Sequence, residues 1–149
     1  MPTSKSSSAD LPDLNVWLAL VSDRHVHHGA AREWFEALEE QRAVFCRVTQ
    51  MGLLRLLTHP KVMGEDALSL AAAWQCYDAL RGDARVVYHI EPPHLEARWR
   101  LLTTRRGEAY SCWTDAYLAA FAFEQGLRLV TFDRWFERQS GLDKLMLAS

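Results

Sequence analysis

Apolar residues along the chain recur with two different spacings. Between residues 26 and 38 they fall at 26, 30, 31, 34, 35 and 38, which is the spacing of one face of a helix. Further helices are expected at residues 16–21, 49–57, 66–80, 91–102 and 115–125. Short apolar runs predict strands at residues 11–15, 43–48, 85–90 and 127–131, and residues 145–147 are a candidate for a small last strand. Strands that alternate with helices indicate a parallel α/β sandwich.

Glycine and proline mark several ends of these elements. Gly126 stands where a left-handed residue would end the helix at 115–125. The strand at 127–131 that follows is nearly all apolar, as expected of a parallel strand covered on both faces. Pro12 has no N–H to donate, which argues against a fully paired central position for the first strand.

Length and composition indicate one well-packed domain. The chain has 149 residues, of which 49% are hydrophobic. We expect residues 1–10 to form a flexible N-terminal tail and residues 11–149 a single domain. The opening residues lack the apolar core of a signal peptide, and no apolar run is long enough to span a membrane. We therefore expect a cytoplasmic protein with no membrane contact.

The remaining composition offers little direct chemistry. Cys46, Cys76 and Cys112 lie far apart, which indicates reduced thiols with neither a zinc site nor a disulfide framework. The formal net charge of −2 gives no overall attraction to nucleic acid. The basic residues are 14 Arg and 3 Lys. Arginine suits phosphate recognition, although an Arg-favouring codon usage explains the bias equally well.

Three aspartates each stand where a strand should give way to a helix. They are Asp13, Asp115 and Asp133. Carboxylates at such junctions can converge at the carboxyl edge of a parallel sheet, where open α/β folds bind their ligands. Oxygen ligands without His or Cys suit Mg²⁺ or Mn²⁺. The pattern predicts a metal-dependent site that acts on phosphate, although each aspartate is also typical of a turn or a helix cap.

Three polar neighbours are expected to support these carboxylates. Asn15 would orient water beside the first aspartate, Thr114 is expected to cap the helix that carries the second, and Thr131 ends the strand before the third. The helix dipole would keep the carboxylate of Asp115 ionised.

Three stretches in this order resemble the PIN-domain ribonucleases, and most closely the VapC-type toxins of bacterial toxin–antitoxin pairs. They are Asp-Leu-Asn at 13–15, Thr-Asp-Ala-Tyr-Leu-Ala-Ala at 114–120, and Glu-Gln-Gly-Leu-Arg-Leu-Val-Thr-Phe-Asp at 124–133. The resemblance covers residues 11–147. It implies a PIN-like three-layer sandwich, with a central, mostly parallel sheet of four or five strands flanked by helices.

The resemblance also implies an activity and partners. The expected activity is endoribonuclease cleavage, with Mg²⁺ or Mn²⁺ held by Asp13, Asp115 and Asp133 as the catalytic group. The expected substrate is RNA such as tRNA or rRNA. A small VapB-like antitoxin and a second copy of the chain, as a homodimer, are the expected partners.

The chain departs from the family at one acid. The family usually places a Glu on the helix after the second strand, where this chain has Leu53 or a neighbour. Glu108 is a weak candidate to replace it and is more typical of a solvated loop. The alternative is a PIN-like binding or interaction module with weakened catalysis. A response-regulator domain would require adjacent early acids and a late Lys, and neither is present.

Other chemical groups keep two interpretations each. His25 and His28 have a spacing that would let them share a helix face, but surface histidines near a helix start are the better interpretation. Arg105 and Arg106 would either steer RNA phosphate or solvate a turn. Trp113, beside the second aspartate, is a candidate for stacking a base. The tryptophans at 17, 34, 74 and 99 are expected in the core or an interface.

Overall fold

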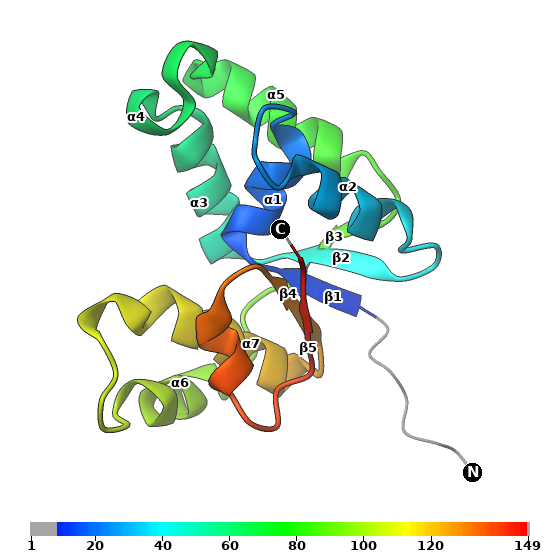
Figure 1. The fold of residues 1–149 in the computed structure, drawn as a ribbon. Helices are drawn as coiled ribbons and strands as arrows, with labels where there is room; N and C mark the ends of the chain where they lie inside the picture. The colour runs from blue at the N-terminus through cyan, green and yellow to red at the C-terminus, as the bar shows by residue number, and fades with distance from the viewer. Residues whose placement is uncertain (1–8, 149) are drawn as a thin grey trace.

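A five-stranded parallel sheet forms the centre of the molecule (Figure 1). The structure, a computed structural model, describes residues 9–148. The strand order is β3-β2-β1-β4-β5, and every neighbouring pair is parallel. The strands are β1 (Ala9–Pro12), β2 (Arg42–Phe45), β3 (Val86–Tyr88), β4 (Arg128–Thr131) and β5 (Lys144–Met146). The predicted α/β sandwich is confirmed, including the small last strand.

Helices cover the two faces of this sheet. The α-helices are α1 (Leu14–Val21), α2 (His28–Glu36), α3 (Arg47–Leu57), α4 (Pro60–Met63), α5 (Leu70–Arg81), α6 (Leu95–Thr103) and α7 (Trp113–Gln125). Short 3₁₀ turns are η1 (Gly64–Asp66), η2 (Tyr110–Cys112) and η3 (Arg134–Arg138). Figure 1 shows α1 to α5 on one side of the sheet, and α6 with α7 on the other. None of the helices in the described part of the chain is long and apolar enough to cross a membrane.

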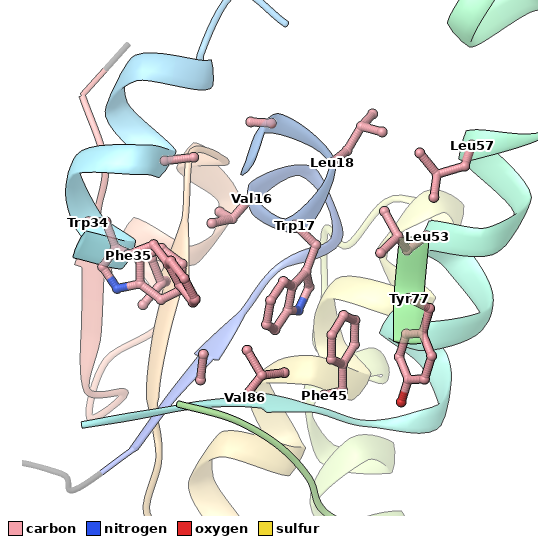
Figure 2. Close-up of a cluster of buried hydrophobic side chains, with 14 of the residues drawn as sticks. Val16, Trp17, Leu18, Trp34, Phe35, Phe45, Leu53, Leu57, Tyr77 and Val86 are labelled. Atoms are coloured by element: carbon pink, nitrogen blue, oxygen red, sulfur yellow. The ribbon is translucent and has the colours of Figure 1, made fainter. Parts of the chain in front are cut away.

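Two hydrophobic cores lie on the two faces, because successive strand residues point to opposite sides. Phe45 of β2 stacks on Trp17 of α1, with ring centroids 3.8 Å apart, and Tyr77 of α5 meets the same ring edge-on (Figure 2). The preceding residue Val44 instead packs in the cluster beneath α7, together with Leu118. Packing on both faces of the sheet holds the ends of its strands in place. The polar residues of the candidate site lie at these ends.

The predicted N-terminal tail was too long by two residues. β1 begins at Ala9, and the side chain of Asp10 is fully buried. Its carboxylate accepts hydrogen bonds from Trp34 Nε1 (2.8 Å), Gln41 Nε2 (3.0 Å) and the Arg128 guanidinium (2.9 and 2.8 Å). These distant partners hold the start of β1 in the sheet. The rest of the predicted tail lies outside the described residues.

The objection from Pro12 to a central strand does not hold here. β1 lies in the middle of the sheet, but its register with β2 involves only Ala9 and Asp10. Pro12 is the last residue of the strand and is paired with Val130 of β4. The missing N–H therefore falls beyond the paired part of the β1–β2 ladder.

Several helix boundaries differ from the prediction. The helix expected at residues 66–80 begins at Leu70, because the Ser69 hydroxyl accepts the N–H of Ala72 and caps it there. The last helix begins at Trp113, so Thr114 lies inside the first turn and is not its cap. Gly126 ends that helix with φ of +66°, as the sequence predicted.

Candidate active site

Asp13 occupies the carboxyl end of β1 and caps α1. The Asp13 N–H donates to the carbonyl of Val130 at 2.8 Å, which keeps the ends of β1 and β4 together. Its Oδ1 accepts the N–H of Leu14 at 2.7 Å, and its Oδ2 accepts the hydroxyl of Thr131 at 2.9 Å. Only 6% of Asp13 is exposed. The carboxylate is therefore held in one orientation by two donors.

Thr131 connects this carboxylate to the backbone of Asp133. The Thr131 hydroxyl, which is fully buried, also accepts the backbone N–H of Asp133 at 2.9 Å. Asp133 in turn caps η3, since its Oδ1 accepts the N–H of Trp135 at 2.9 Å. The Asp133 side chain faces solvent. A single hydroxyl thus sets the relative placement of Asp13 and Asp133.

Asp115 enters the same region from the first turn of α7. Its pKa is raised from the usual 3.8 to about 7, first by burial, and then by the negative charges of Asp13 and Asp133 and a hydrogen bond with Asp133. Burial also raises the pKa of Asp13, although its bonds from Thr131 and Leu14 oppose that shift. The three predicted aspartates are therefore close enough to repel one another.

The expectation that the α7 dipole keeps Asp115 ionised is wrong. A helix N-terminus favours a carboxylate by about 0.3–1 kcal/mol on an exposed surface. Burial and two neighbouring acids outweigh that contribution, because all of them disfavour the charged form. This mutual repulsion is what a bound cation would relieve.

The donor set fits a hard divalent cation by its chemistry. The three side chains offer only carboxylate oxygens, and each oxygen keeps a lone pair beyond the hydrogen bond that it accepts. Within residues 9–148, however, no group of three acidic, His or Cys side chains is already arranged to hold a metal ion. Asp13, Asp115 and Asp133 are neighbours that would have to turn toward a common ion.

The other two supporting residues lie at the rim. Asn15 is the second residue of α1, and Thr114 is the second residue of α7; both are exposed. Neither side chain forms a hydrogen bond with another described residue. Their role beside the carboxylates remains a prediction, whereas Thr131 has a defined place between two of them.

Leu53 does not belong to the site. It is fully buried and packs in the core cluster of Trp17 and Phe45, as Figure 2 shows. The candidate neighbours on α3 are Gln50, a buried polar side chain whose Oε1 accepts a hydrogen bond from Arg47, and Gly52. A Cβ at Gly52 would lie 2.7 Å from a methyl carbon of Leu14, the residue after Asp13. No residue of α3 is acidic, so this helix contributes no carboxylate.

Glu108 and the histidines have other partners. Glu108 accepts hydrogen bonds from Trp135 Nε1 (3.0 Å) and from Arg105 (2.9 Å), so it anchors its loop and is not simply solvated. His28 Nδ1 lies 2.8 Å from the carbonyl of Ala19, and His25 Nδ1 accepts the N–H of His27 at 3.0 Å. These contacts support the interpretation of His25 and His28 as structural residues near the start of α2.

The three cysteines, and three of the four tryptophans expected in the core or an interface, lie in or against the core. All three thiols are free, and Cys46 and Cys112 are buried. Trp17 and Trp34 lie in the core, and Trp99 packs partly against the α7 cluster. Trp74 differs, because half of it is exposed on α5.

The five parallel strands and the helices that cover them define an α/β fold. The cluster of acids forms a candidate site at the carboxyl edge of its sheet. The family model of the PIN domain matches residues 11–142. Ribonuclease VapC41 of Mycobacterium tuberculosis is 43% identical over 143 residues, which cover 93% of this chain and 98% of that protein. Ribonuclease VapC38 of the same organism is 35% identical over 123 residues, which cover 83% and 84%. The chain belongs to the PIN domain family, among its VapC-type members.

Solved structures share the fold at low sequence identity. The structure of VapBC2 from Rickettsia felis, bound to a DNA fragment from their promoter, has a TM-score of 0.72 at 12% identity and covers 94% of this chain and 99% of that one. Mycobacterium tuberculosis VapC20, described as a toxin that cleaves the sarcin–ricin loop, has a TM-score of 0.66 at 22% identity and covers 89% and 95%. These likenesses confirm the PIN-like three-layer architecture.

Proposed function

We propose that this chain is an endoribonuclease that hydrolyses RNA phosphodiester bonds with Mg²⁺ or Mn²⁺ bound by Asp13, Asp115 and Asp133. The observation that carries the proposal is the convergence of the three aspartates: the Thr131 hydroxyl bridges the Asp13 carboxylate and the Asp133 backbone at the ends of β1 and β4, and Asp115 hydrogen-bonds Asp133 from the first turn of α7. The 43% identity to a protein named a ribonuclease supports the same activity. The chain would act as the toxin of a toxin–antitoxin pair.

The three aspartates lie in different environments, and we therefore expect them to have different roles. Asp13, fixed by Thr131 and by the N–H of Leu14, presents an oriented carboxylate at the floor of the site. Asp133, exposed above it, and Asp115 on α7 complete an anionic edge. A bound divalent cation would supply charge neutralisation at the phosphate and acidify a water molecule. With its pKa raised to about 7, Asp115 would be partly protonated near neutral pH without a cation, and a bound cation would favour its ionised form.

The proposed partners follow from the relatives. The solved neighbours include VapBC assemblies, which supports a small VapB-like antitoxin for this chain. An acidic site of this kind suits a peptide whose Arg takes the place of the cation. The name of VapC20 makes rRNA a candidate substrate beside tRNA. A homodimer and a cytoplasmic location complete the proposal.

Two measurements on the purified chain test this function. Cleavage of total RNA should require Mg²⁺ or Mn²⁺, stop with EDTA and be lost in Asp115→Asn. Millimolar Mn²⁺ should also raise the melting temperature of the wild type, because a ligand that binds only the folded state stabilises it. The Asp13→Asn variant should show a smaller shift, and Asp78→Asn, an exposed change on α5, should match the wild type.

The non-catalytic alternative has one specific observation in its favour, the absence of an acid on α3. It makes a different prediction in cells. Expression of the nuclease should stop growth and degrade RNA, and co-expression of a small neighbouring gene should restore growth. If the wild type and Asp115→Asn leave growth and RNA equally intact, the binding module is the correct function.

A further inference from the structure

Trp113 presents an exposed aromatic ring at the start of α7, the helix that carries Asp115. It is the first residue of α7, two positions before Asp115, and 58% of it is exposed. Tyr110, in the turn just before it, is 91% exposed. Large aromatic side chains usually bury most of their surface. Two exposed aromatic side chains at the start of one helix therefore call for an explanation.

The exposed Trp113 is nevertheless held in place. Trp99 of α6 donates its Nε1 hydrogen to the carbonyl of Trp113 at 3.0 Å, and the two rings meet edge-on with centroids 6.2 Å apart. Trp99 also packs edge-on against Tyr117, whose hydroxyl donates to Glu91 at 2.8 Å. These contacts hold the first turn of α7 against α6, and the edge-on contact with Trp99 supports the Trp113 ring without covering it, as a preorganised binding surface requires.

A cavity of about 390 Å³ lies between these two tryptophans and the outer side of α6. Its volume is in the range of small-ligand pockets, roughly 300–1,000 Å³. It is lined by Glu96, Trp99, Arg100, Thr103, Thr104 and Trp113. An aromatic wall and a guanidinium group therefore border the same space.

The charges around this cavity favour an anionic ligand with a flat apolar part. Arg100 is bound to Glu96 at 2.8 Å, but both side chains are about 70% exposed (74% and 69%), so this pair is weak and a phosphate can replace it. Arg105 and Arg106 follow in the adjoining loop and are exposed. Arg106 has no ion-pair partner among the described residues. The residues that line the cavity include one acid, Glu96, and one base, Arg100. The excess of positive charge comes from Arg105 and Arg106 in the adjoining loop.

We propose that the groove of Trp99, Trp113 and Arg100 binds an unpaired nucleobase of the RNA substrate, on a face of α7 other than the one that carries Asp115. The base would stack on Trp113, and the arginines would hold its flanking phosphate. Single-stranded nucleic acid is bound in this way, by aromatic faces that accept any base and by basic groups that follow the backbone. The arginines match the phosphates of RNA, whereas an apolar peptide would offer them no anionic partner. This inference rests on the proposed function for its substrate.

Binding can be measured without cleavage, so the two proposals can fail separately. The protein is Asp115→Asn, and the probe is a short fluorescein-labelled single-stranded RNA, followed by fluorescence anisotropy. Adding Trp113→Ala should weaken binding by about 5- to 150-fold, the range found for losing one stacked base. Trp113→Phe should retain most of the affinity. The matched control is Trp74→Ala, which removes another half-exposed tryptophan, from α5 on the opposite face of the sheet.

Each outcome decides one point. The proposal is overturned if Trp113→Ala binds the single strand as tightly as Trp74→Ala does. It is also overturned if Trp113→Ala changes only the oligomeric state or the capture of an antitoxin, because the groove then belongs to a protein partner. A perfect duplex should lose little affinity, since its bases are already stacked. Absence of cleavage by the wild type, with intact binding through Trp113, rejects the nuclease and keeps the base site.

Discussion

Thr131 and Asp13 are joined by a buried hydrogen bond of 2.9 Å, although 118 positions separate them in the sequence. The same hydroxyl accepts the N–H of Asp133 at 2.9 Å. One side chain thus connects the Asp13 carboxylate to the backbone of Asp133, and so links two acidic residues that follow neighbouring strands. The acidic edge depends on a residue that bears no charge.

Replacing this hydroxyl should affect both stability and activity. Thr131→Val keeps the shape of the side chain but leaves Asp13 Oδ2 and the Asp133 N–H without their partner. We expect a loss of about 1–3 kcal/mol in the free energy of unfolding, measured by urea denaturation. RNA cleavage should fall as well, because Asp13 loses a bond that opposes the rise of its pKa. Thr131→Ser, which keeps the hydroxyl, should preserve both; equal losses in the two variants would contradict the bridging role.

The raised pKa of Asp115 predicts how stability changes with pH. Its folded-state pKa of about 7 lies above the usual 3.8, so the folded chain binds the extra proton between these values. Stability is therefore fully present below about pH 4 and is lost as the pH rises to about 7. Asp115→Asn removes this loss. In EDTA, its melting temperature should exceed that of the wild type at about pH 8 and match it near pH 4.

A control separates this effect from general charge. Asp78→Asn also removes one carboxylate, but from the exposed surface of α5. Its melting curve should follow that of the wild type across the same pH range. Curves of the wild type and Asp115→Asn that run parallel from acid to neutral pH would show that the repulsion at Asp115 is absent.

A substitution of Asp10, near the amino-terminal end of β1, should change the stability of the fold without changing metal binding. Asp10 is fully buried and accepts bonds from Trp34, Gln41 and Arg128. Asp10→Ala should cost about 3–5 kcal/mol, as removal of one partner from a buried ion pair does. The rise in melting temperature with Mn²⁺ should remain, since the carboxylate site lies at the opposite end of the strand.

The surface pair Arg32–Glu36 serves as the control for Asp10. Its atoms are 4.0 Å apart, and both side chains are more than half exposed (63% and 58%). Glu36→Gln should change the free energy of unfolding by less than about 0.5 kcal/mol. A comparable loss in both variants would show that the burial of Asp10 is not what stabilises β1.

The sequence predicted the parts of the fold that local patterns determine. Alternating apolar runs and helical spacings were enough for the parallel α/β class. Two strand-to-helix junctions placed Asp13 and Asp133 at one edge of the sheet. The third expected junction is wrong, because Asp115 follows the 3₁₀ turn η2 and reaches the same region from α7. Their assignment as metal ligands stays a prediction. Gly126 was predicted because a left-handed residue after a helix has its own sequence signal.

The predictions that were wrong concern segments whose structure depends on contacts between distant parts of the chain. Ala9 and Asp10 were assigned to a tail, because nothing local shows that Arg128 would bind the Asp10 carboxylate. The start of α7 was misplaced because its cap residue, Cys112, makes no side-chain hydrogen bond there. A polar sequence alone therefore does not show whether a segment joins the sheet.

The missing acid on α3 gives the last prediction. Leu53 or a neighbour stands where the family usually has a Glu, but Leu53 is fully buried in the core beside Trp17. A carboxylate there should cost about 3–5 kcal/mol and leave the metal requirement unchanged.

Gln50→Glu is the matched test of position 50. Gln50 is the buried polar residue of the same helix and has nearly the shape of Glu, and its partner Arg47 would form a stronger, charge-assisted bond with the new carboxylate. The melting temperature should stay close to that of the wild type. If residue 50 takes the place of the family's Glu, the Mg²⁺ concentration for half-maximal RNA cleavage should fall, because a divalent cation gains an oxygen ligand. An unchanged Mg²⁺ requirement in a stable Gln50→Glu would show that the site works with three acids alone, and a lower requirement in Leu53→Glu would reverse the assignment made from the core packing.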